Sequence, residues 1–293
     1  MTRLKHLLTF SNPLLLALVA LTYTLGTGIA RYLGRADHPL VFGMGFGWVI
    51  LLLLAMNLLA IYFRPHNERL TEEETIVERN WLRAAAFQIS IAALSVVALL
   101  TVFLLQQGVS PAALFFALLI FLAAIAYALP PLRLVTSGFG EFILAILFAL
   151  LIPAFSLTLQ LGELHRLLGA VAFPLAALAL AFFLVLNFPA YKEDHKYERG
   201  SLLLRVGWQR AISLHHILIF SAYFLFAAMP FIASVPWAVI SSVFLVMPFA
   251  IFQVYWMQQI ANGVSPNYKF LTLLAITVLG LTTYTLTLTF WIR

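Results

Sequence analysis

The run LNFPAYKEDHKYERGSLLLRVG, from Leu186 to Gly207, is a polar connection between two long apolar stretches. These stretches, Leu167–Phe188 and Ile212–Ile232, each have about 20 residues, the length that crosses roughly 30 Å of hydrocarbon as a helix. A compact group of acidic and basic side chains between two such stretches indicates a membrane chain whose chemistry lies in its loops.

Composition extends this interpretation to the whole chain. Of the 293 residues, 63% are hydrophobic and 10% are charged, and the mean hydropathy is +1.01. Soluble domains carry about a quarter charged residues, so the composition excludes a water-soluble protein. Cysteine is absent, which excludes disulfides and thiolate metal sites. The basic N-terminus, MTRLKH, precedes a run long enough to span and without a small-residue cleavage site, which predicts an uncleaved first helix.

Nine apolar runs are long enough to cross a bilayer. They are continuous and lack the alternation of a membrane barrel, so we expect helices. The sequence predicts an all-α integral membrane protein with one domain over residues 1–293 and spans at Pro13–Ala30, Phe42–Tyr62, Leu82–Leu105, Pro111–Leu129, Phe142–Leu161, Leu167–Phe188, Ile212–Ile232, Trp237–Gln258 and Phe270–Trp291.

Basic residues predict the orientation, because cytoplasmic loops are enriched in Lys and Arg. With nine spans, only four basic residues fall on the side opposite the N-terminus: Arg31, Arg35, Arg166 and Arg293. The other 13 fall on the same side as the N-terminus. We expect the plasma (inner) membrane, with the N-terminus cytoplasmic and the C-terminus outside. The net charge of +6 then reflects orientation, and no nucleic-acid partner is expected.

The first run offers an acid and several cations. Asp194 lies seven residues after Asn187, two turns along the same face if the segment is helical. Lys192 and Lys196 flank Asp194 and are suited to binding anionic oxygens. We interpret Arg199 and Arg210, further on, as ordinary positive-inside anchors.

A second run, AYALPPLRLVTSGFGE, covers Ala126 to Glu141. Its double proline ends an apolar helix, because proline lacks an N–H group and disfavours helix before it. Arg133 is therefore expected at the cytoplasmic mouth of the bundle.

A third run, NLLAIYFRPHNERLTEEETIVER, covers Asn57 to Arg79. Asn57 is polar within an apolar helix, which indicates either a functional group or a hydrogen bond between helices. Glu68 and Glu72 to Glu74 follow and are potential ligands. The simpler interpretation is that Thr71 caps the third span and the acids complement its helix dipole.

Together, in this order, the three runs resemble the UbiA superfamily of intramembrane prenyltransferases. The resemblance implies a bundle of nine helices around a central cavity open toward membrane and cytoplasm. It implies Mg²⁺ held by aspartates, a bound isoprenoid diphosphate, and prenyl transfer to an aromatic acceptor. The roles expected from it are catalysis by Asp194, Asn187 and Asn57, metal binding by Asp194, and diphosphate binding by Arg64, Arg133, Lys192 and Lys196. Glu68 lies outside the family pattern and is the second candidate metal ligand, in place of a lost aspartate.

The chain departs from the family pattern at four of five aspartates, where it has Leu58, Ile61, Pro65 and Ala190. We therefore favour a non-catalytic or strongly divergent member that binds an isoprenoid, quinone or pigment, alone or as a subunit of a membrane protein complex. The alternative is an active Mg²⁺-dependent prenyltransferase. A transporter ranks third. Under both leading hypotheses the partners are membrane lipid and an isoprenoid or quinone-like molecule, and Asn57 and Asp194 face a common cavity.

Overall fold

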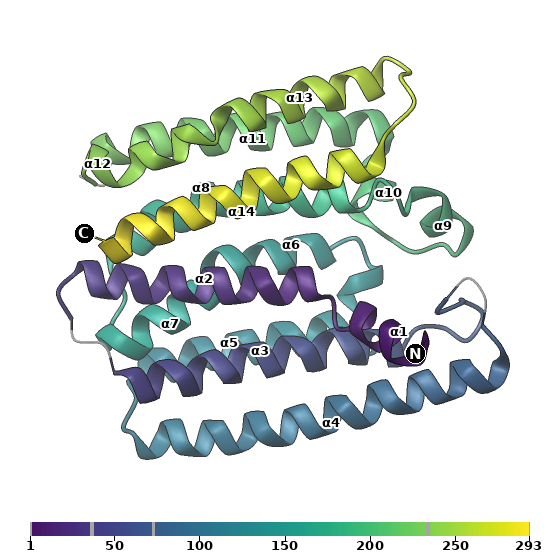
Figure 1. Ribbon diagram of the computed structural model, residues 1–293, viewed down its shortest axis with the longest axis horizontal. Helices are drawn as coiled ribbons and strands as arrows, with labels where there is room; N and C mark the ends of the chain where they lie inside the picture. Colours follow the sequence, from purple (N-terminus) through teal and green to yellow (C-terminus); the bar gives the residue numbers. More distant parts are fainter. Residues whose placement is uncertain (1, 36–37, 72–73, 233–234, 293) are drawn as a thin grey trace.

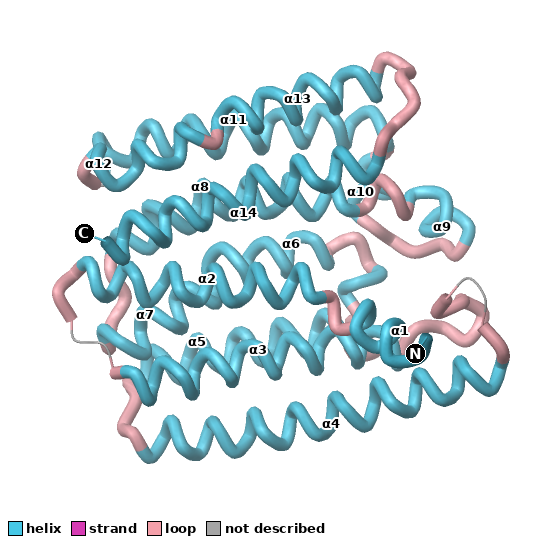
Figure 2. The backbone as a smooth tube through the Cα atoms, viewed as in Figure 1, coloured by secondary structure: helices cyan, strands magenta, loops and turns pink. Residues whose placement is uncertain are grey.

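The computed structural model describes residues 2–35, 38–71, 74–232 and 235–292, and within them it contains helices and no strands (Figures 1 and 2). The α-helices are α1 (Thr2–Phe10), α2 (Pro13–Tyr32), α3 (Pro39–Tyr62), α4 (Ile76–Gln106), α5 (Pro111–Ala128), α6 (Gly140–Ile146), α7 (Ile152–Leu161), α8 (Arg166–Leu186), α9 (Tyr191–Lys196), α10 (Leu202–Val206), α11 (Trp208–Ile232), α12 (Trp237–Ile240), α13 (Met247–Ala261) and α14 (Tyr268–Ile292).

The described chain has eight helices long and apolar enough to cross a membrane, and a bent pair that brings the number to nine if it is one span. One of the eight consists of α6 and α7, joined by the π-helical segment Leu147–Leu151. The bent pair combines Trp237–Leu245 with α13 at 42°. Pro248, in the first turn of α13, has no N–H group for a hydrogen bond to the preceding turn. The all-α membrane fold expected from the sequence is confirmed.

The start of α4 differs from the sequence prediction. Thr75, and not Thr71, is the N-cap, because the Thr75 hydroxyl accepts a hydrogen bond from the Glu78 N–H at 3.2 Å. The Thr71 hydroxyl is buried and has no hydrogen-bond partner. The helix begins at Ile76, ahead of the predicted Leu82, because capping chemistry and not hydropathy determines where it starts.

The acidic run before α4 folds back on the loop. Glu74 accepts hydrogen bonds from the N–H groups of Leu70 and Thr71, at 3.0 and 3.2 Å, and pairs with Arg79 at 2.6 Å. Glu72 and Glu73 lie outside the described residues. Glu74 thus stabilises the connection between α3 and α4 and lies away from the cavity described below.

Helix α2 packs against α7 on one side and α14 on another. Gly26 permits the first contact, because a Cβ atom there would lie 2.1 Å from the Pro153 carbonyl oxygen. The second contact includes a hydrogen bond from the Trp291 indole N–H to the Thr24 carbonyl oxygen, at 2.9 Å. The first and last spans of the chain are therefore neighbours.

The polar elements collect at one end of the bundle. Helices α1, α9 and α10 and the connection from α3 to α4 lie at the right of Figure 1, and the C-terminus lies at the opposite end. In an apolar stretch of 18 residues, 78% of the residues are buried in the span α6–α7 and in α8, compared with 22% in α4. The end of the bundle carrying the polar loops is the one that holds the candidate site.

Candidate functional site

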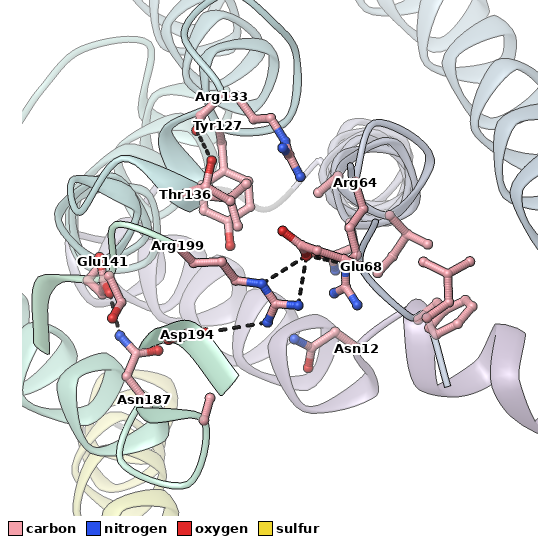
Figure 3. Close-up of a pocket in the computed structure, with 18 of the residues that line it drawn as sticks. Asn12, Arg64, Glu68, Tyr127, Arg133, Thr136, Glu141, Asn187, Asp194 and Arg199 are labelled. Carbon is pink, nitrogen blue, oxygen red and sulfur yellow. Dashed lines mark hydrogen bonds and ion pairs between the residues drawn. The ribbon is translucent and has the colours of Figure 1, made fainter. Parts of the chain in front are cut away.

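A cavity of about 450 Å³ lies at this end, and several polar loops contribute to it (Figure 3). Its lining comes from the α1–α2 junction, the end of α3 and the loop after it, the α5–α6 connection, and the segment from α8 to α10. The residues that line it are Thr9, Phe10, Asn12, Asn57, Ala60, Ile61, Arg64, Glu68, Leu70, Tyr127, Arg133, Val135, Thr136, Glu141, Asn187, Ala190, Asp194, Arg199 and Ser201.

Arg199 lies at the centre of this group, between two carboxylates (Figure 3). Its Nε and Nη2 atoms lie 2.9 and 2.7 Å from Oε2 of Glu68, and its Nη1 atom lies 3.4 Å from Oδ1 of Asp194. The sequence interpretation of Arg199 as an ordinary anchor is wrong. Its partner Glu68 is 131 residues away in the chain, so no local pattern could indicate the pair.

The two long loops meet at one cavity, as predicted. Asn57 and Asp194 both line it, and the Arg199–Glu68 pair joins the loop after α3 to the loop after α9. The Asn57 amide donates to the Ser11 carbonyl oxygen at 3.0 Å. Asn57 therefore ties α3 to the α1–α2 junction, which is the interhelical hydrogen bond that the sequence left open.

Glu141 is a site residue that the sequence prediction did not include. Its Oε1 atom accepts hydrogen bonds from the Asn187 amide and from the Leu202 N–H, the latter at 2.9 Å. An acid at the start of a long apolar run is the signal that could have indicated it, and the structure shows Glu141 buried in the first turn of α6. Glu141 fixes the end of α8 and the start of α10, so it places the segment that carries Asp194 and Arg199.

The four predicted diphosphate-binding cations separate into two pairs. Arg64 and Arg133 line the cavity, and the Arg133 Nε atom is buried without a hydrogen-bond partner. Lys192 is exposed and is not part of the lining. Lys196 lines a neighbouring pocket of about 540 Å³, with its ammonium group 5.2 Å from the centre of the Tyr197 ring.

Burial and charge shift the pKa values of these groups. Burial raises the pKa of the Asp194 carboxyl, and the charge of Arg199 opposes that rise. For Arg199 itself, burial acts to lower the pKa, but the hydrogen bond to Glu68 and the carboxylate charges raise it overall. Burial lowers the pKa values of Arg64 and Arg133, and the charge of Arg199 acts in the same direction. Arg199 is thus the best-compensated cation of the three.

The acids of this cavity do not fit a Mg²⁺ site as they are arranged. Mg²⁺ needs oxygen ligands in near-octahedral geometry at about 2.0–2.1 Å. Glu68 and Asp194 direct oxygens at the Arg199 guanidinium, and Glu141 is engaged by two N–H donors. Among the described residues no group of three or more histidine, cysteine or acidic side chains could hold a metal ion.

Apolar side chains occupy two positions where the resemblance places aspartates. Ile61 and Ala190 line the cavity and offer no oxygen ligand from their side chains. Leu58 is buried outside the lining. Asp194 is the remaining acid in a matching position, and it is buried against Arg199.

Comparison with known proteins identifies the fold. No protein-family model and no curated protein matches the sequence. Among solved structures, digeranylgeranylglyceryl phosphate synthase matches over 100% of both chains, with a TM-score of 0.63 at 14% identity. A UbiA homolog from Archaeoglobus fulgidus bound to DMAPP and Mg²⁺ matches 96% of this chain and 98% of its own, with a TM-score of 0.63 at 15% identity. A UbiA homolog from Aeropyrum pernix K1 matches 93% and 94%, with a TM-score of 0.53 at 12% identity. The chain therefore has the fold of these UbiA homologs.

Proposed function

We propose that this protein binds an isoprenoid or quinone-like lipid in its cavity, as a non-catalytic or strongly divergent member of the UbiA group. The observation that carries the proposal is the Arg199 guanidinium between Glu68 and Asp194. It pairs with the two carboxylates that a Mg²⁺-dependent enzyme would need free. Removing metal ligands from a transferase weakens the stabilisation of its leaving diphosphate, which is the main task of such a site.

The shape of the cavity supports an amphipathic ligand. A smaller pocket of about 220 Å³ shares Asn12, Tyr127, Val135, Glu141 and Asn187 with the main cavity. Its further lining includes the apolar side chains of Leu15, Leu144, Phe183 and Leu186. A polar head group would lie near the arginines and an apolar chain would occupy the smaller pocket, the usual division of a ligand site into a few polar groups and apolar walls.

An active prenyltransferase is the second candidate, and one observation favours it. The A. fulgidus homolog with this fold binds DMAPP and Mg²⁺, and the cavity here still holds Asp194 and Glu68. In that case Arg199 would have to leave the two carboxylates before they could bind a metal.

The test is turnover by purified wild-type protein. We expect no Mg²⁺-dependent release of diphosphate from DMAPP or geranyl diphosphate in the presence of aromatic acceptors, and no difference between wild type and Asp194→Asn. We also expect mass spectrometry to identify a lipid that co-purifies with wild type and is depleted in Arg133→Gln but not in the surface control Arg210→Gln. Mg²⁺-dependent turnover that Asp194→Asn abolishes and Glu68→Gln reduces would establish the enzyme instead.

A further inference from the structure

We infer that Arg199 is the resident cation of this cavity: its guanidinium takes the place of a divalent ion between Glu68 and Asp194, and an anionic phosphate head group binds through Arg64 and Arg133 without metal. The choice of head group rests on the proposed function, whereas the replacement of the metal by Arg199 does not.

The buried carboxylates of Glu68 and Asp194 require positive charge beside them. The Glu68 and Asp194 side chains are 4% and 8% exposed, and buried carboxylates need a compensating partner. Arg199 supplies that charge from the loop that follows α9, the helix that carries Asp194. The backbone N–H of Arg199 donates a hydrogen bond to the backbone carbonyl oxygen of Asp194 at 2.9 Å. The guanidinium is thus held where a metal ion would have to enter.

The cavity has more guanidinium N–H donors than its carboxylates can accept. Arg199 directs two nitrogens at one Glu68 oxygen, and the Arg64 Nε atom lies 3.8 Å from that same oxygen. The Arg133 Nε atom is buried and has no partner. The Arg64 Nη1 atom donates to the Arg69 carbonyl oxygen at 3.4 Å. The remaining N–H groups of Arg64 and the Arg133 Nε–H are available to a ligand, and guanidinium groups bind phosphate oxygens through paired hydrogen bonds.

Backbone geometry is consistent with this use of Arg133. Its φ of 38° lies in the left-handed region, which costs energy for any residue with a side chain. Such conformations persist at functional sites when the surroundings fix them. Figure 3 shows the Arg133 side chain directed toward Arg64 and Glu68.

Metal binding tests the first part directly, with Mn²⁺ as the probe and electron paramagnetic resonance as the readout. Wild type and the control variant Arg210→Gln should both leave the signal of free Mn²⁺ unchanged. Arg199→Gln should bind Mn²⁺ at least about tenfold more tightly, because it frees two carboxylates. The triple variant Arg199→Gln, Glu68→Gln, Asp194→Asn should lose that binding again.

Wild-type protein provides a second test, because any Mn²⁺ that it binds can be traced to these carboxylates. Mn²⁺ binding by wild type that Glu68→Gln with Asp194→Asn removes would overturn the inference. So would an Arg199→Gln protein that folds and does not gain Mn²⁺ affinity. Arg199→Lys keeps the charge and should exclude Mn²⁺ as wild type does.

Calorimetric titration tests the second part, with inorganic pyrophosphate and geranyl diphosphate as separate probes. Geranyl diphosphate should bind equally well in EDTA and in Mg²⁺, and Arg133→Gln should weaken it about tenfold or more, since it removes a charge-assisted hydrogen bond. Binding of pyrophosphate with the same affinity would identify free phosphate as sufficient. Affinity that requires Mg²⁺ would overturn metal-free binding.

The two proposals fail separately. Turnover of geranyl diphosphate in EDTA would overturn the proposed function and leave Arg199 as the resident cation. Mn²⁺ bound at Asp194 in a wild-type protein without turnover would overturn the role of Arg199 as the resident cation and leave the proposed function standing.

Discussion

Glu141 and Arg199 organise the site by linking segments that are far apart in the chain. Glu141 joins residues 46 and 61 positions away, and Arg199 reaches a partner 131 positions away. Asn57 was predictable because it is polar within an apolar run, and Asp194 because it lies two helical turns after Asn187, at the end of the preceding apolar run. Arg199 was not, because a basic residue in a polar loop has the same local sequence whether it anchors the chain or fills a cavity.

Replacing Glu141 with Ala should destabilise the protein. The Leu202 N–H and the Asn187 amide would lose their acceptor, and an unsatisfied buried donor costs about 1–3 kcal/mol. The measurement is the free energy of unfolding in mixed micelles. Glu163→Ala is the matched control, because Glu163 is an exposed acid in the connection between α7 and α8. Equal stability of the two variants would contradict the role of Glu141.

Helix boundaries were predictable where a proline or an abrupt change in hydropathy marks them. They were less predictable where a capping hydrogen bond determines the first residue of the helix. The end of α5 before Pro130 and the start of α2 at Pro13 follow from proline. Helix α4 starts earlier than its apolar run, and the span after α11 is bent at 42°. The Thr75 cap accounts for the first feature and the proline at position 248 for the second, and a window of mean hydropathy contains neither.

Thr75→Ala should destabilise α4 by about 1 kcal/mol, since it removes the N-cap acceptor for the Glu78 N–H. Thr75→Ser should be close to neutral, because it keeps the hydroxyl. Thr71→Val tests the interpretation that the structure corrected, and it should have little effect since the Thr71 hydroxyl has no hydrogen-bond partner. Thermal unfolding in detergent measures the stability of all three variants. A larger loss of stability for Thr71→Val than for Thr75→Ala would support Thr71 as the N-cap, as the sequence predicted.

The whole molecule has its termini at opposite ends of the bundle, as an odd number of spans requires (Figure 1). The polar loops gather at the end where α1 lies, so the loops that carry most of the basic residues share one side. Which side faces the cytoplasm remains a prediction from the distribution of Lys and Arg.

Cysteine labelling in intact cells tests this orientation, and the chain has no native cysteine to interfere. Lys196→Cys should be protected from a membrane-impermeant reagent, and Glu163→Cys should react. The two positions lie beyond opposite ends of α8, whose 21 residues span about 30 Å. Labelling of Lys196→Cys from outside, with protection of Glu163→Cys, would invert the proposed topology.

The contact between α2 and α14 has a consequence for how the protein is made. A ribosome delivers α2 long before α14, yet these two helices pack side by side, with the Trp291 indole hydrogen-bonded to the Thr24 carbonyl oxygen. The early helices can insert and pair locally as they emerge, as α3 and α4 do. The face of α2 that receives α14 stays uncovered until α14 has been synthesised. This bundle can therefore close only after the 25-residue helix α14 has emerged.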